Sequence, residues 1–202
     1  MKTIIGILIS YISLYLVIYL HEVGHAIFYY KYGCKDNWWQ VTVKPYLFFS
    51  TPLPVDIEKA RLLSKKQNIF VASGGIIVNL ISAVISFLIL KMAGQNYYIN
   101  LFLYQFITLH LGEAVTYLVI GNIYLVSDME TIAAQKPSLR PFYFIFGLLV
   151  GIIYILVLKN VPNQYKFLVY LFNIVSILCM SIGRIVFTII HKRNSKEKRE
   201  LI

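Results

Sequence analysis

Two histidines and a glutamate lie in one short run, His21-Glu22-Val23-Gly24-His25, inside an apolar stretch of the chain. On a helix the histidines occupy positions i and i+4, so their rings lie about 6 Å apart on one face and can reach a single metal ion. A glutamate beside such a pair can take a proton from water that the metal activates. The spacing predicts one zinc ion bound by His21 and His25, with Glu22 as general base of a hydrolase.

The apolar setting favours a metal site over a chance match to this spacing. An ionised side chain near the middle of a bilayer costs roughly 2.5–3.5 kcal/mol. Zinc offsets that cost because it engages both imidazoles and neutralises carboxylates. A purely structural role provides little comparable stabilisation.

The composition is that of a membrane protein. The chain has 202 residues, 58% of them hydrophobic, with a mean hydropathy of +0.69, which is too apolar for a soluble domain. We therefore treat residues 1–202 as a single membrane domain. The net charge of +10 is spread over short loops and a basic tail rather than along one soluble face, so we expect a lipid bilayer and no nucleic acid as partner.

Five stretches are long enough to cross a hydrocarbon layer of about 30 Å. They predict an all-α integral membrane protein with five transmembrane helices, at residues 3–30, 68–91, 98–126, 141–158 and 165–190. An odd number of spans places the termini on opposite sides of the membrane. The first three spans, within residues 1–130, hold the candidate site, and residues 131–202 add two helices and a basic tail.

The distribution of lysine and arginine predicts the orientation. With the basic tail in the cytoplasm and the N-terminus outside, fourteen of the nineteen basic residues fall on the cytoplasmic side, four fall outside, and Arg184 lies within the fifth span. This asymmetry predicts a multi-pass protein of the cell membrane whose candidate site lies near the cytoplasmic face.

The loop between the first two spans is the one sizeable segment expected outside the membrane. Residues 38–44 are rich in aromatic and β-branched side chains with polar residues between them, which predicts a short strand or β-hairpin. Residues 56–66 are amphipathic and predict a short helical segment on the inner membrane surface.

A catalytic zinc ion needs a third protein ligand. His25 precedes Lys31 by six residues, so it lies about 9 Å inside the first cytoplasmic charge. Asp128 follows the third span where that span approaches the cytoplasm, so the charge-derived topology places it on the same side as the histidines. We therefore predict Asp128 as the third ligand, the alternative being an ordinary carboxylate at a helix end.

Three segments of the chain resemble the site-2 protease family of intramembrane zinc metalloproteases. They are the HEVGH run, the small-residue segment Ser73-Gly74-Gly75-Ile76-Ile77-Val78-Asn79, and the segment from Asn122 to Asp128. The resemblance implies a three-helix catalytic core with His21, His25 and Asp128 as ligands and Glu22 as base. It describes a minimal form of the family, because we find no PDZ or nucleotide-binding domain in the sequence.

The resemblance also implies two substrate-binding residues, Asn79 and Asn122. The chain departs from the family around the third ligand: no proline lies between Asn122 and Asp128, and Met129 replaces the usual glycine. These departures keep open a second class of function, a non-catalytic metal-binding membrane protein that serves in peptide binding, immunity or transport.

His110 and Glu113 are two further polar residues of the third span, at positions i and i+3. They fit a hydrogen-bonded structural pair, or else a ligand or proton-path role. On an unbroken helix Glu113 and Asp128 would lie about 22 Å apart, so both could meet one ion only if the helix is broken. A membrane zinc protease of another type, with a glutamate as third ligand, would use Glu113.

The function expected from these features is hydrolysis of peptide bonds in membrane-spanning or membrane-associated peptides. Zinc would polarise the scissile carbonyl and lower the pKa of its water toward about 7, and Glu22 would carry the proton to the leaving amine. The substrate would unwind locally and pair with the edge of the strand at 38–44. Neither the substrate's identity nor the oligomeric state follows from the sequence.

Overall fold

The computed structural model describes residues 2–45, 47 and 50–200, together with their side chains except those of residue 184 and residues 187–200. Its regular elements are helices, in the order α1 (Lys2–Lys31), α2 (Ile57–Arg61), α3 (Lys65–Met92), α4 (Tyr97–Val115), the π-helix η1 (Thr116–Gly121), α5 (Asn122–Tyr124), α6 (Ser127–Gln135), the 3-10 helix η2 (Pro137–Leu139), α7 (Arg140–Lys159) and α8 (Asn163–Glu200). The all-helical prediction is confirmed for this part of the chain.

Five helices of the described chain are long and apolar enough to cross a membrane. They span Lys2–Lys31, Lys65–Met92, Tyr97–Tyr124, Pro137–Lys159 and Asn163–Gly183. These ranges match the five predicted spans closely, because the length of an apolar run is a property of composition. The chain therefore has the form of a multi-pass membrane protein.

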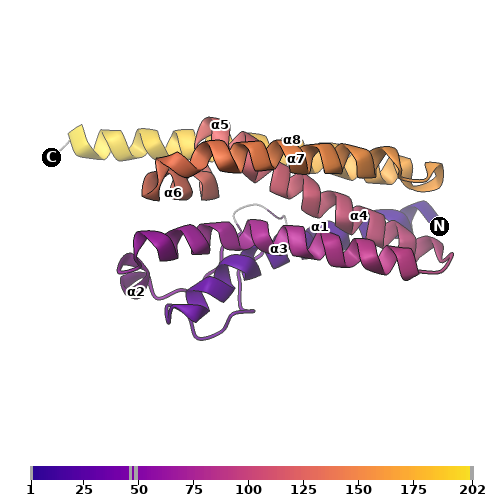
Figure 1. Cartoon of the computed structure of the whole chain (residues 1–202), viewed down its shortest axis with the longest axis horizontal. Coiled ribbons are helices and arrows are strands. Elements are labelled where there is room, and N and C mark those ends of the chain that lie inside the picture. Colours follow the sequence, from indigo (N-terminus) through magenta and orange to yellow (C-terminus); the bar gives the residue numbers. More distant parts are fainter. Residues whose placement is uncertain (1, 46, 48–49, 201–202) are drawn as a thin grey trace.

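The long helices lie roughly along one axis, with the N-terminus at one end and the C-terminus at the other (Figure 1). Helices α1 and α3 pack closely against each other, and α4 packs against α1, α3, α7 and α8. The third long segment is the central one, since 78% of its most apolar window is buried. Polar side chains on α4 therefore face protein rather than lipid.

Glycines set the close approach of α1 and α3. A Cβ atom added at Gly24 would collide with the backbone of Gly74, and one added at Gly74 would collide with the backbone of Gly24. Small residues allow two membrane helices to touch at their backbones. This contact lies between His21 and His25, so it brings α3 directly against the HEVGH face of α1.

The third long segment is not a straight helix. It passes from α4 through the π-helix η1 into the three-residue helix α5, and Leu125 then adopts a left-handed conformation with φ 51°. Val126 is extended, and α6 starts afresh at Ser127. The predicted third span is therefore present as Tyr97–Tyr124, and the helix is broken before Asp128, which is the condition under which Glu113 and Asp128 can lie near one ion.

The loop between α1 and α2 folds back along α1. The Tyr19 hydroxyl donates to the carbonyl oxygen of Trp39 at 2.7 Å, and the Tyr11 hydroxyl donates to that of Pro45 at 2.6 Å. Tyr19 precedes Lys31 by twelve residues, about 18 Å of helix. The loop therefore runs beside the apolar part of α1.

The predicted β-hairpin in this loop is not confirmed. The described residues form one isolated antiparallel bridge, between Thr42 and Thr51, and no strand at 38–44. Proline at positions 45, 52 and 54 removes backbone donors that a longer ladder would need. The predicted helical segment at 56–66 is present as the short helix α2, which Asp56 caps by accepting the backbone N–H of Lys59.

Candidate metal centre

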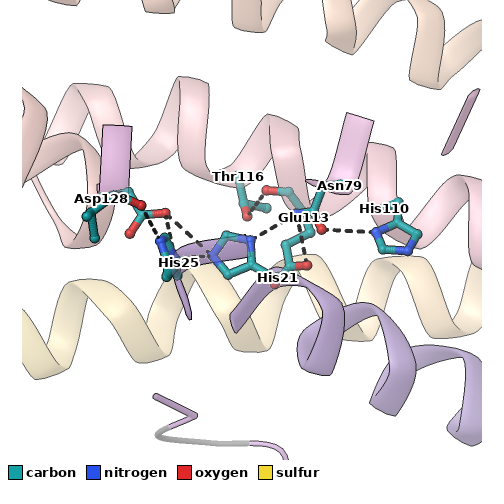
Figure 2. A network of polar contacts seen from close by, with 8 residues as sticks. His21, His25, Asn79, His110, Glu113, Thr116 and Asp128 are labelled. Atoms are coloured by element: carbon teal, nitrogen blue, oxygen red, sulfur yellow. Dashed lines mark hydrogen bonds and ion pairs between the residues drawn. The ribbon is translucent and has the colours of Figure 1, made fainter. Parts of the chain in front are cut away.

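Three side chains with metal-binding atoms converge between α1 and α6 (Figure 2). His25 Nε2 lies 3.0 Å from His21 Nε2. Asp128 Oδ2 lies 3.4 Å from Nε2 of His21 and 3.5 Å from Nε2 of His25. The two histidines are buried and the Asp128 side chain is 12% exposed, so the cluster is screened from its surroundings.

Two of the three separations fit the geometry of a tetrahedral zinc site, and the third is close to it. Zinc binds imidazole nitrogen and carboxylate oxygen at about 2.0–2.2 Å, which places neighbouring ligand atoms of a tetrahedron about 3.3–3.6 Å apart. The two distances to Asp128 fall in this range, and the distance between the histidine nitrogens is slightly shorter. Two imidazoles and one carboxylate also form a donor set that leaves a fourth position open for water.

His25 is oriented for ligation by a bond on its far side. Its Nδ1 lies 2.7 Å from the carbonyl oxygen of Val71 in α3, and because a carbonyl only accepts, Nδ1 carries the proton. Nε2 of His25 therefore presents a lone pair to the cluster. A backbone carbonyl in this position is a common way to fix the tautomer of a ligating histidine.

His21 is enclosed on several sides. The Tyr117 ring from η1 stacks on the His21 ring, with centroids 4.3 Å apart and planes within 9°. Gly75 in α3 leaves room for the imidazole, since a Cβ atom there would collide with the ring. The Nδ2 atom of Asn79 lies 3.1 Å from Nδ1 of His21. These contacts hold the ring in one position.

Glu22 lies beside the cluster on the wall of a cavity of about 490 Å³. His25, Glu113, Tyr117 and Asp128 also line this cavity, and residues of the α1–α2 loop and of α8 close its other sides. The break at Leu125 explains why Glu113 and Asp128 share one cavity although fifteen residues separate them. The site thus combines a metal-binding cluster with a buried carboxylate and a space for a ligand.

The remaining predicted site residues lie in different surroundings. Asn79 is fully buried beside His21 and does not itself line the cavity, although it is bonded to Glu113, which does. Asn122 is also buried, but it lies away from the cavity and exchanges hydrogen bonds with Arg140 at the start of α7. Their roles in substrate binding stay predictions, and a substrate contact would require either side chain to leave its present partners.

His110 and Glu113 are joined through Asn79. His110 Nδ1 donates to Asn79 Oδ1 at 3.0 Å, and Asn79 Nδ2 donates to Glu113 Oε2 at 3.1 Å. Asn79 therefore bridges the i, i+3 pair. Glu113 is not part of the ligand cluster, which contains Asp128 as its carboxylate in the described chain.

Two residues that hold His21 were not identified from the sequence. Tyr117 stacks on His21 from the π-helix η1, and no spacing rule predicts such a turn. Gly75 belongs to the small-residue segment that we noted, but its contact with His21 depends on how α1 and α3 are rotated. The signal that could have found Tyr117 is its position four residues after Glu113, because residues at i and i+4 share one helix face.

A lysine fixes the loop that closes the cavity. Lys35 is buried, and its ammonium group donates to the carbonyl oxygens of Pro52 at 2.8 Å and Pro54 at 2.6 Å. Burial lowers the pKa of Lys35, while the nearby Asp36 carboxylate acts in the opposite direction. This clamp holds Thr51 and Pro52 against the cavity.

Comparison of the whole chain with protein families, with curated proteins and with solved structures finds no match in any of the three.

Proposed function

We propose that this protein is a zinc-dependent intramembrane endopeptidase. The observation that carries the proposal is the convergence of His21, His25 and Asp128 within a bundle of apolar helices, beside a cavity that Glu22, His25 and Asp128 line. Polar and ionisable groups are costly in this setting, and a hydrolytic metal centre accounts for all four of them together. The resemblance to the site-2 protease family, with a core made of the first three long segments, supports the same conclusion.

His21, His25 and Asp128 would hold the ion. When bound there, zinc supplies Lewis acidity, which polarises a peptide carbonyl and makes water more acidic. Zinc is the favoured metal because the donor set has two imidazoles and one carboxylate and the ligand separations suit a tetrahedron.

Glu22 is the residue that moves the proton. It accepts one proton from the attacking water, whose oxygen bonds to the carbonyl carbon. It then delivers that proton to the amine nitrogen as the C–N bond breaks, so one water molecule is consumed for each peptide bond. Glu22 lines the same cavity as His25 and Asp128, which supports this role.

The cavity favours an extended peptide as substrate. A membrane helix hides its carbonyls in its own hydrogen bonds, so it must unwind before cleavage. Residues 50–52 run along the cavity, and Ser50 Oγ is buried there without a hydrogen-bond partner among the described residues. This segment, bridged to Thr42, supports pairing of an unwound peptide with the loop.

The test is cleavage of a co-expressed library of membrane peptides, together with the zinc content of the purified protein. Glu22→Gln is expected to keep its zinc but to lose at least about 100-fold in cleavage rate, since general acid–base catalysis contributes about 10²–10⁴-fold. Glu58→Gln is the matched control, because Glu58 is an exposed glutamate on α2 paired with Arg61. It should cleave at the wild-type rate.

Asp128→Asn tests the third ligand in the same assay, and it is expected to lose zinc and activity together. Cleavage by Glu22→Gln at the wild-type rate would refute the general-base role. Zinc bound by a wild-type protein that shows no Glu22-dependent cleavage would identify the chain as a non-catalytic metal-binding protein.

A further inference from the structure

Asn79 connects the candidate metal centre to a second pair of polar residues deeper in the bundle (Figure 2). Its Nδ2 lies 3.1 Å from His21 Nδ1 and 3.1 Å from Glu113 Oε2, and its Oδ1 lies 3.0 Å from His110 Nδ1. All four side chains are buried. The amide of Asn79 is therefore fully engaged, with its donor end toward His21 and its acceptor end toward His110.

This arrangement determines where the ring protons lie. A carbonyl oxygen only accepts, so His110 carries its proton on Nδ1. An amide nitrogen only donates, so Nδ1 of His21 is a bare acceptor, and the proton of a neutral His21 ring lies on Nε2. The Nε2–H of His21 then donates to Nε2 of His25 across 3.0 Å.

Metal ligation requires the opposite tautomer of His21. A neutral imidazole that binds a metal through Nε2 carries its proton on Nδ1 and donates it to an acceptor. In the present arrangement that proton would meet the donor end of Asn79. When a metal ion binds, either the Asn79 amide must turn over or another group must accept the Nδ1 proton of His21.

We propose that Asn79 is a positioning residue whose amide turns over when the metal binds, so that His110 moves its proton from Nδ1 to Nε2. Turning the amide by half a rotation exchanges Oδ1 and Nδ2 without moving the rest of the side chain. Oδ1 then accepts from His21 Nδ1, and Nδ2 donates to His110 Nδ1. This inference rests on the metal site of the proposed function, but it does not depend on peptide cleavage.

The surroundings of His110 allow this change. Nε2 of His110 is buried and has no hydrogen-bond partner in the described part of the chain, so a proton can move there without breaking an existing bond. Glu113 would lose its hydrogen bond from Asn79 Nδ2. Its Oε2 would then face the amide oxygen, which is an acceptor, and must turn away from Asn79. The rival arrangement keeps the amide fixed and lets Glu113 accept the Nδ1 proton of His21.

Ring-¹⁵N NMR of the full chain in lipid nanodiscs separates the two arrangements. The protein has four histidines, so single substitutions assign their signals, and His191 serves as an internal reference. On addition of one equivalent of zinc, we expect the protonated nitrogen to change from Nε2 to Nδ1 in His21 and from Nδ1 to Nε2 in His110. Zinc binding at His21 with the His110 proton still on Nδ1 would overturn the proposal.

Asn79→Leu provides a second measurement. Loss of an outer partner of a metal ligand typically weakens metal binding about 10–100-fold, and we expect this loss together with a His110 spectrum that no longer responds to zinc. Asn173→Leu is the control, since Asn173 is another buried amide, bonded to Thr108 and Tyr154 away from the cluster. It should bind zinc as the wild type does, and equal affinity in Asn79→Leu would also refute the proposal.

The NMR experiment distinguishes this proposal from the proposed function. Zinc-dependent signals in His21 and His110 from a protein that cleaves nothing would leave the amide turnover intact and refute the peptidase. Cleavage that depends on Glu22, together with a His110 signal that does not change on zinc addition, would support the peptidase and refute the amide turnover. A wild-type protein that binds no zinc would refute both.

Discussion

His21 is the most constrained side chain of the candidate site. Its ring is stacked by Tyr117, faces Gly75 and is bonded through Nδ1 to Asn79, while Nε2 points into the cluster. A ligand that is already held in place loses little side-chain entropy when the metal binds. We therefore expect metal affinity to depend strongly on residues that never touch the ion.

Gly75→Ala tests this dependence directly. The added Cβ would overlap the His21 ring, so the ring must move away from the position shared with His25 and Asp128. We expect zinc affinity to fall at least about 10-fold, comparable to the loss of an outer partner of a ligand, when measured by competition with a chromophoric chelator. Gly151→Ala is the control, because the nearest atom to its added Cβ lies at 3.9 Å. Equal zinc affinity in the two variants would show that Gly75 does not position His21.

The HEVGH run illustrates what a spacing can predict at this scale. The i, i+4 relation is internal to one helix, so the facing of His21 and His25 follows from helix geometry alone. The contacts of His21 with Tyr117, Gly75 and Asn79 join three separate segments, and they depend on helix rotations that no local pattern records. For this reason the sequence predicts His21 and His25 as candidate ligands on one face, but it does not predict the contacts that orient His21.

At the scale of elements, the turn at Leu125 brings the third candidate ligand to the histidines. Asp128 lies in the first turn of α6, a helix that starts afresh after this turn. No proline or glycine lies between Asn122 and Asp128, so no local pattern predicts the left-handed turn at Leu125. The left-handed conformation of Leu125 costs roughly 1–2 kcal/mol for an L-residue.

Substitutions at Leu125 should separate its conformation from its bulk. Leu125→Val places a β-branched residue at φ 51°, and we expect it to lower the free energy of unfolding by about 1–2 kcal/mol and to weaken zinc binding. Leu125→Gly adopts this conformation without strain and should retain zinc as the wild type does. Thermal denaturation with and without zinc measures both effects. A valine variant as stable as the wild type would show that the turn does not depend on this residue.

For the whole molecule, the five apolar spans were the part most fully predicted from sequence. Their lengths follow from composition, and the described helices reproduce them. The loop after α1 folds back along α1, where the hydroxyl groups of Tyr11 and Tyr19 donate to its backbone. Those tyrosines lie within an apolar span and resemble lipid-facing residues, so the sequence alone does not reveal their loop contacts.

Removal of the proposed zinc ion should destabilise the entire bundle, because the candidate cluster joins α1 to α6. A ligand bound only by the folded state stabilises it by about 2.7 kcal/mol at 100 times its dissociation constant. We expect a chelator to lower the Tm of the wild-type protein and added zinc to restore it. Asp128→Asn should show little response to either treatment. A wild-type Tm that does not change with chelator at any concentration would refute a metal bound between these helices.

The orientation of the chain determines from which side the metal and the water reach the site. The excess of lysine and arginine at the end that carries α2 and α6 predicts that this end faces the cytoplasm. In a variant without its two native cysteines, Gly94→Cys in the α3–α4 turn should react with a membrane-impermeant maleimide in intact cells. Glu58→Cys on α2 should react only after the cells are permeabilised. Because His25 lies only six residues before Lys31, the opposite labelling pattern would move the whole metal centre to the outer leaflet and require extracellular zinc.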